Sequence, residues 1–259
     1  MAMIPNAALG LLLAAMTAHG VGRIWRTRLA DWAGYGAMTL AWGLLSACIV
    51  LRWAQAGRAP MANQYESLLW LAWFLPPIGA WAARRLNLDW AGLLASTLAA
   101  ASLAAASLLD ASITPLMPAL RSNWLAYHVA TAMAAYATLA LSAGAGALYL
   151  AKAGDEDFAE RVDRASARIV RVGLFLLTVG IATGSVWAQQ AWASYWSWDP
   201  KETWSLITWL FYAAALHMRK TRGWTGRRFA WLCVAGFAAV LFTYFGVNYL
   251  LGGLHSYRL

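Results

Sequence analysis

Eight apolar segments, each close to the length needed to cross a membrane, dominate this chain. A spanning helix needs about 20 predominantly apolar residues, and only 12% of the 259 residues are charged, too few to cover a soluble domain of this size. We predict an all-α integral membrane protein, a single membrane domain over residues 1–259. The longest loop, about 152–169, has mixed charge and is expected to be a short surface helix or a solvated connector. The predicted spans are roughly 4–22, 33–51, 67–83, 90–109, 124–151, 170–188, 200–218 and 229–251.

Lysine and arginine are divided unevenly between the two sets of loops. Fifteen lie on one side, which we predict to be cytoplasmic, and five on the other, so both termini are expected on the outer, periplasmic side. The first span has no basic residue before it, and Arg23, Arg26 and Arg28 follow it, which is the reverse of a cleaved signal peptide. We therefore expect this span to be retained. Because the basic residues are scattered between spans, no nucleic-acid interface is expected.

Two cysteines give no sign of thiol or metal chemistry. Cys48 and Cys233 both lie inside apolar spans and form no Cys-x-x-Cys pair. A thiol–disulfide oxidoreductase or a structural zinc site is therefore not expected, and the two side chains are predicted to be small buried hydrophobes.

The most unusual stretch is the run 187–204, WAQQAWASYWSWDPKETW, which joins two apolar segments. It holds five tryptophans and a tyrosine in eighteen positions. An interfacial aromatic belt accounts for Trp25, Trp32 and Trp224, but not for this density in one outer loop. A sheet of indole rings at the membrane surface can hold a large, flat, apolar molecule that also carries charge, and porphyrin fits that description. The predicted haem platform consists of Trp187, Trp192, Tyr195, Trp196, Trp198, Asp199, Glu202 and Trp204.

The four histidines are candidate ligands for a haem iron. His128 lies near the outer end of its span and His255 just past the outer end of the last one, level with the run 187–204. Two imidazoles on opposite faces are the usual axial ligands of six-coordinate haem iron, so we predict this pair as external ligands. His217 and His19 fall in the inner half and form a candidate inner pair. For each histidine taken alone, interfacial anchoring remains the alternative.

Two short motifs match helix caps. The tetrapeptide 199–202, Asp-Pro-Lys-Glu, has the acceptor, proline and glutamate spacing of a capping box, and Asn63 and Glu66 in NQYESL repeat the spacing. A capping box would fix the exit of the run and orient its rings, without excluding contact with haem. The outward cations are candidates to contact haem propionates: Lys201, Arg121, Arg52 and Arg58.

At these residues the chain resembles a known family. The run resembles the tryptophan-rich WWD signature of haem-handling proteins in cytochrome c assembly, and with SLITWLFYAAALH after it, the CcsA/ResC branch of system II. SNWLAYHVATAMAAYA, NQYESLLWLAW and NYLLGGLHSY are similar to other motifs of that branch, and together the motifs cover roughly 60–258. The chain departs from the branch at Gln189 and Gln190, where Asn-Glu is usual, and at Ala193, where glycine is usual.

The resemblance implies eight spans in the bacterial inner membrane, with the run facing the periplasm. It implies that His128 and His255 are the external haem ligands and that His217 is a transmembrane ligand. The second membrane histidine of the branch generally comes from the partner protein, CcsB/ResB, which weakens the case for His19. The implied partners are a CcsB/ResB-like membrane protein, apocytochrome c, haem b as the transported substrate, and membrane lipid.

The sequence thus predicts haem transport or presentation for covalent attachment to the CxxCH motif of apocytochrome c. Lyase activity follows from the resemblance alone, because no classical acid–base or nucleophile set is visible. A resident b-type cytochrome is one alternative, although it needs no exposed tryptophan platform. A second alternative is a CcmC-like haem-delivery protein of system I. The eight predicted spans and the position of His217 after the seventh span argue against it. A transporter without haem would need polar residues or broken helices at mid-membrane.

Overall fold

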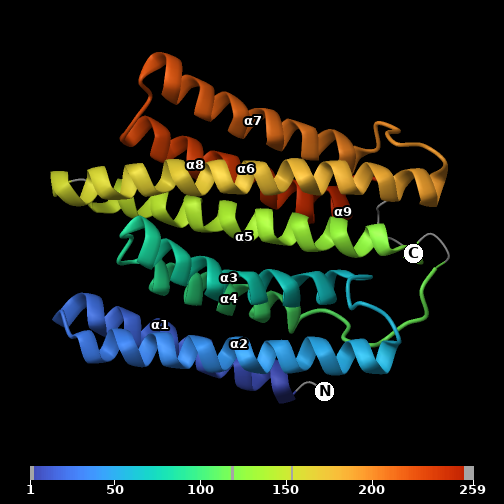
Figure 1. Cartoon of the computed structure of the whole chain (residues 1–259), viewed down its shortest axis with the longest axis horizontal. Coiled ribbons are helices and arrows are strands. Elements are labelled where there is room, and N and C mark those ends of the chain that lie inside the picture. Colours follow the sequence, from blue (N-terminus) through green and yellow to red (C-terminus); the bar gives the residue numbers. More distant parts are fainter. Residues whose placement is uncertain (1–2, 118–119, 153, 254–259) are drawn as a thin grey trace. The chain divides into compact units, whose positions relative to one another are not determined.

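The regular structure of this chain is entirely helical. The computed structural model describes residues 3–117, 120–152 and 154–253, and no β-strand occurs within them (Figure 1). The predicted all-α class is confirmed. The helices gather in two compact units, Met1–Leu116 and Met117–Leu259.

The first unit contains four helices: α1 (Met3–Trp25), α2 (Arg28–Ala56), α3 (Gln64–Leu86) and α4 (Ala91–Ala106). Helix α1 packs along α2 and α4, and α3 packs on α4. The contact between α3 and α4 is very close, because a Cβ placed on Gly79 would lie only 2.3 Å from the Cβ of Ala95. Small residues let the backbones of membrane helices approach in this way.

The second unit contains α5 (Asn123–Lys152), α6 (Glu156–Trp192), α7 (Pro200–Arg222), α8 (Arg227–Leu241), the π-helix η2 (Phe242–Gly246) and α9 (Val247–Leu250). Helix α5 packs along both α6 and α8, and α7 packs on α6 and α8. The start of α5, the end of α6 and the α6–α7 connection lie at one end of this unit (Figure 1). The predicted platform and His128 therefore share that end.

The eight predicted spans correspond to eight helical segments among the described residues, because α8, η2 and α9 continue without a break over Arg227–Leu250. Five of these are long and apolar enough to cross a membrane: α1, α2, α5, α6 and Arg227–Leu250. Helix α4 has 16 residues, about 24 Å of helix, less than a usual span. In α3 and α7, tryptophans and charged ends lower the mean hydropathy. The expected surface helix at 152–169 is continuous with α6, which begins at Glu156 with Asp155 as its N-cap.

A partly buried carboxylate ties α6 to the turn between α7 and α8. Asp163 accepts hydrogen bonds from both terminal nitrogens of Arg219, and its Oδ1 also accepts from the backbone N–H of Gly226 at 2.8 Å. Gly226 has a φ of 60°, and a Cβ there would lie 2.8 Å from the Tyr149 hydroxyl, so glycine fits this position best. The carboxylate thus fixes both a helix end and the turn that follows.

Substituting Asp163 by alanine is expected to lower the free energy of unfolding by about 2–3 kcal/mol, because charge-assisted bonds to a half-buried guanidinium are lost. The measurement is denaturant unfolding of the purified protein in mild detergent. Alanine at Asp157, an exposed residue in the first turn of α6, is the control and should change stability by less than about 1 kcal/mol. Equal effects of the two substitutions would contradict this role of Asp163.

Candidate functional site

His128 on α5 is held by α6 in a defined orientation. Its Nδ1 lies 2.8 Å from the carbonyl oxygen of Gly180. A carbonyl can only accept, so Nδ1 carries the proton and donates it, and Nε2 is the nitrogen with the lone pair. The ring also stacks on Trp187, with centroids 6.0 Å apart and an interplanar angle of 8°. Metal-binding histidines commonly donate their second N–H to a carbonyl, which orients the ring and raises its basicity.

The space for this imidazole is made by a glycine. A Cβ on Gly184 would lie 2.6 Å from Nδ1 of His128 and 2.8 Å from its Cε1, so no larger residue fits without moving the ring. Gly180, which supplies the carbonyl, comes one helical turn earlier on the same face of α6. The sequence analysis missed this role of both glycines. The available signal was the spacing Gly-x-x-x-Gly, a known motif of close helix contact.

The aromatic residues of the run 187–204 divide into a buried and an exposed group. Trp187 is buried beside His128, and Trp192 meets it edge to face with centroids 4.7 Å apart. Tyr195 and Trp198 are 60% and 68% exposed, and Trp196 packs perpendicular to Trp198 at 5.7 Å. Aromatic surface is therefore presented outward on a support of the buried Trp187 and the partly buried Trp192. Such an arrangement can cover a flat apolar molecule.

The carboxylates of the run organise its backbone. Asp199 and Glu202 form a reciprocal capping box at the start of α7, as the sequence predicted. Glu202 also accepts from the backbone N–H of Ser197 at 2.8 Å, and Thr203 donates to the carbonyl of Trp198 at 3.2 Å. These bonds fix the loop that carries the exposed rings, so both carboxylates act at least as supports of the platform.

Two residues of the run have a left-handed backbone conformation. Ala193 ends α6 with φ 57° and ψ 25°, and Trp198 has φ 60°. Non-glycine residues avoid this region, and bulky ones do so strongly. Strain of this kind persists where the surroundings enforce it, often at functional sites. Glycine, which is usual at this position in the CcsA/ResC branch that the chain resembles, would adopt this conformation without strain.

Replacing Ala193 with glycine is therefore expected to raise the free energy of unfolding by about 0.5–1 kcal/mol, because the strain exceeds the entropy lost by glycine. Denaturant unfolding in detergent measures the change. Glycine at Ala191, two residues earlier within α6, is the control and should lower stability by roughly 0.5–1 kcal/mol. If both variants lose stability, the strain at Ala193 is not significant.

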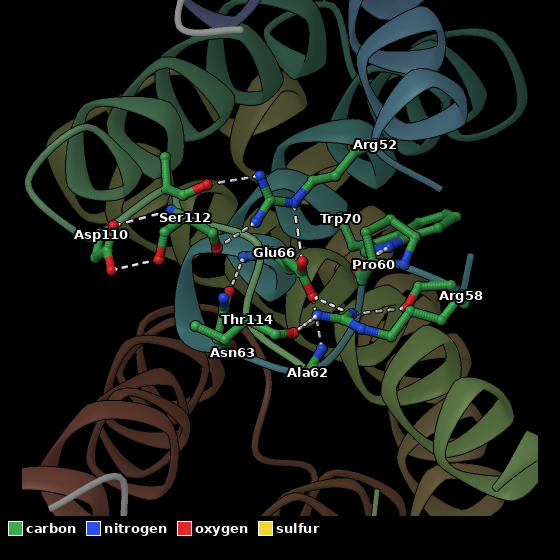
Figure 2. A network of polar contacts seen from close by, with 12 residues as sticks. Arg52, Arg58, Pro60, Ala62, Asn63, Glu66, Trp70, Asp110, Ser112 and Thr114 are labelled. Atoms are coloured by element: carbon green, nitrogen blue, oxygen red, sulfur yellow. Dashed lines mark hydrogen bonds and ion pairs between the residues drawn. The ribbon is translucent and has the colours of Figure 1, made fainter. Parts of the chain in front are cut away.

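Arg52 and Arg58, two candidate propionate contacts, belong to a buried network at the start of α3 (Figure 2). Arg52 donates through Nε to Glu66 at 2.8 Å, and through its terminal nitrogens to the carbonyls of Ala111 and Ser112. Arg58 donates to the other oxygen of Glu66 at 2.9 Å. Glu66 is fully buried, and Arg52 is 2% exposed. All three nitrogen groups of Arg52 thus have protein acceptors, and contact with a propionate would require these bonds to break.

The predicted cap at NQYESL is confirmed, although its carboxylate does more than cap. Asn63 Oδ1 accepts from the backbone N–H of Glu66 at 2.8 Å, as predicted for an N-cap. The Glu66 carboxylate accepts from the N–H of Ala62 at 2.7 Å and from both arginines. The other candidate cations lie in the second unit. Arg121 is exposed, and Lys201 Nζ donates to Asn248 Oδ1 at 2.7 Å.

The remaining histidines have different surroundings. His217 is exposed on α7, and His255 lies outside the described residues. His19 is 2% exposed in the first unit, with Nδ1 3.5 Å from Asp31 and its ring edge to face with Tyr35 at 4.6 Å. Their roles as haem ligands stay predictions. Within residues 3–117, 120–152 and 154–253, no group of three or more His, Cys, Asp or Glu side chains could bind a metal ion by itself.

Comparison with known proteins gives a consistent result. The profile of a family described as Cytochrome C assembly protein matches residues 61–255. A cytochrome c biogenesis protein CcsA from Guillardia theta is 38% identical over 278 aligned positions, which cover 95% of this chain and 92% of the relative. The CcsA protein of Synechococcus sp. (strain CC9902) is 42% identical, and the alignment covers 83% of each chain.

A solved structure described as Cytochrome c Heme Lyase CcmF has a similar fold. Its TM-score is 0.69 at 18% sequence identity, and the match covers 93% of this chain and 46% of that chain. At this identity the likeness concerns the fold alone. The family profile and the CcsA relatives carry the assignment: this chain belongs to the cytochrome c assembly protein family, among the CcsA proteins.

Proposed function

We propose that this protein holds haem at the run 187–204 and presents it for covalent attachment to apocytochrome c. A role in cytochrome c maturation follows from the family. The observation that carries the haem-holding proposal is the hydrogen bond from His128 Nδ1–H to the Gly180 carbonyl, because it makes Nε2 the basic nitrogen of an oriented imidazole. The stacked Trp187 supports the proposal by preventing rotation of that ring.

The chemistry of the run suits haem as a cargo. Exposed Tyr195 and Trp198 offer apolar faces to a porphyrin, and exposed Arg121 is an outward cation of the second unit for its propionates. Lys201 is a candidate propionate contact only where its bond to Asn248 breaks. His255 is proposed as the second axial ligand. With two imidazoles bound, the iron has no open position for oxygen, which helps to keep it reduced.

The attachment chemistry belongs largely to haem b and its acceptor. The two thiols of a CxxCH motif each add S–H across one vinyl group, so that a C–S bond forms and the hydrogen moves to the neighbouring carbon. The histidine of that motif must displace one external ligand of the iron. The protein's own residues hold the ring, expose its vinyl groups and orient His128.

The path of haem to this site is part of the proposal. His217 is proposed as a transmembrane ligand, with a CcsB/ResB-like partner supplying the opposing histidine, and His19 as a weaker candidate. The protein would lie in the bacterial inner membrane with the run 187–204 and both termini facing the periplasm. The uneven distribution of basic residues supports this orientation.

An absorption spectrum of the purified protein, with and without a CcsB-like partner, tests the proposal. Wild type is expected to show a reduced six-coordinate bis-imidazole haem. Substitution of His128 or His255 by alanine should weaken that spectrum, and added imidazole should restore it. His217→Ala should lower the amount of haem bound without this rescue at the outer site. Absence of haem in both preparations, or a spectrum unchanged by all three substitutions, would contradict the assignment. Haem that is never passed to apocytochrome c would instead indicate a resident b-type cytochrome.

A further inference from the structure

A partly buried polar contact joins the exit of the run 187–204 to the C-terminal end of the described chain. Lys201, the second residue of α7, donates from Nζ to Oδ1 of Asn248 in α9 at 2.7 Å. Asn248 is only 2% exposed, and Lys201 is half-buried. A hydrogen bond from a cation to an amide oxygen is charge-assisted and directional, and partial shielding from water strengthens it. The contact therefore fixes α9 against the start of α7.

A second contact occurs five residues further along the chain. A Cβ placed on Gly253 would lie 2.4 Å from Oδ2 of Asp199 and 3.0 Å from Cδ of Pro200. The backbone at Gly253 thus rests directly on the capping box of the run, where a side chain would not fit. By contrast, a Cβ on the neighbouring Gly252 would meet nothing within 4 Å. The close contact of the backbone with Asp199 and Pro200 therefore requires glycine at position 253 but not at position 252.

The π-helix η2 orients the following residue Asn248 toward Lys201. A π turn holds one residue more than an α turn, so it rotates everything after it around the axis by about 100°. The turn is anchored to α7, since Thr243 bonds the hydroxyl of Thr208 at 3.0 Å and donates to the carbonyl of Trp204 at 3.2 Å. Such turns often occur at functional sites.

Asn248 takes part in this contact through its amide oxygen, which accepts from Lys201. Its Nδ2 is buried and has no hydrogen-bond partner among the described residues. A leucine of similar size would remove that unsatisfied donor but would also remove the acceptor of Lys201. Asn248→Leu therefore isolates the role of the oxygen.

We propose that Lys201, Asn248 and Gly253 are positioning residues that join the platform to the segment leading into His255. The inference deepens the haem-holding function and rests on it. The sequence places His255 two residues after Gly253. The contacts at Asn248 and Gly253 therefore hold the described chain beside the capping box of the run up to two residues before the second proposed ligand in the sequence.

Spectra of Lys201→Met, Asn248→Leu and Gly253→Val, purified in detergent with the partner, test this role. All three are expected to reproduce the spectrum of His255→Ala, with loss of six-coordinate haem and recovery on addition of imidazole. The matched controls are Lys220→Met at the exposed far end of α7 and Gly252→Val, and both should keep the wild-type spectrum. A Lys201 that only contacts a propionate would lower the amount of haem but keep its ligation, and Asn248→Leu would then resemble wild type.

Hydrogen exchange of the haem-free protein gives a readout independent of the proposed function. Amides from Val247 to Gly253 should exchange at least about tenfold faster in Lys201→Met than in Lys220→Met, because the tether is lost. Unchanged exchange together with unchanged ligation would overturn the inference. If wild type holds no haem while Lys201→Met still speeds exchange, the haem-holding function fails and the tether remains.

Discussion

Replacing Glu66 with alanine is expected to lower the free energy of unfolding by about 3–5 kcal/mol, the largest stability loss predicted for this chain. Glu66 is fully buried and is the carboxylate partner of both Arg52 and Arg58. Its removal leaves two guanidinium groups buried without a counter-charge, at the place where Arg52 also holds the carbonyls of Ala111 and Ser112 (Figure 2). Denaturant unfolding in detergent measures the change.

A double-mutant cycle separates the ion pair from packing. Arg58→Ala combined with Glu66→Ala should destabilise by at least about 1 kcal/mol less than the sum of the single changes, because they share one interaction. Alanine at Asp110, an exposed carboxylate that bonds Ser112 in the same loop, is the control and should change stability by no more than about 0.5 kcal/mol. Strict additivity would show that the Arg58–Glu66 ion pair contributes nothing beyond the separate effects of the two side chains.

The sequence was sufficient to predict the helices, because their pattern is local. Apolar length placed eight helical segments, and the cap spacing placed the starts of α3 at Asn63 and of α7 at Asp199. The sequence predicted a short surface helix or a solvated connector at 152–169, but not that the helix continues unbroken into the span as α6 from Glu156. One face of this segment is buried, with Val162, Ala165 and Ile169 at helical spacing.

The contacts that define the site could not be predicted, because they join residues far apart in sequence. The sequence presents Arg52 and Arg58 as outward cations and Glu66 as a helix cap, and nothing in it indicates that the three side chains meet. The carbonyls that complete the Arg52 network lie 59 and 60 residues away. Carbonyl acceptors leave no pattern in a sequence, since every residue has one. Gly180 could not be predicted as the partner of His128 either, because it too contributes only a backbone carbonyl.

Valine at Gly184 is expected to reduce haem retention roughly tenfold or more, although Gly184 carries no ligand atom. The added side chain would meet Nδ1 of His128 at 2.6 Å, so the imidazole must leave the Gly180 carbonyl and its stack on Trp187. Overpacking of this kind costs about 1–3 kcal/mol, and 1.4 kcal/mol corresponds to tenfold in affinity. The bis-imidazole absorbance per mole of purified protein measures the effect, and added imidazole should restore it.

Epistasis distinguishes displacement of His128 from general damage to α6. Adding Gly184→Val to His128→Ala should cause no further loss of haem, because the ring that the valine displaces is already absent. Alanine at Gly184 should give a smaller loss than valine, since fewer atoms enter the space. Valine at Gly43 on α2, where a Cβ meets nothing within 4 Å, is the control for a glycine-to-valine change in a membrane helix. A further loss in the double variant would mean that Gly184 acts through the packing of α6 on α5 rather than through the orientation of His128.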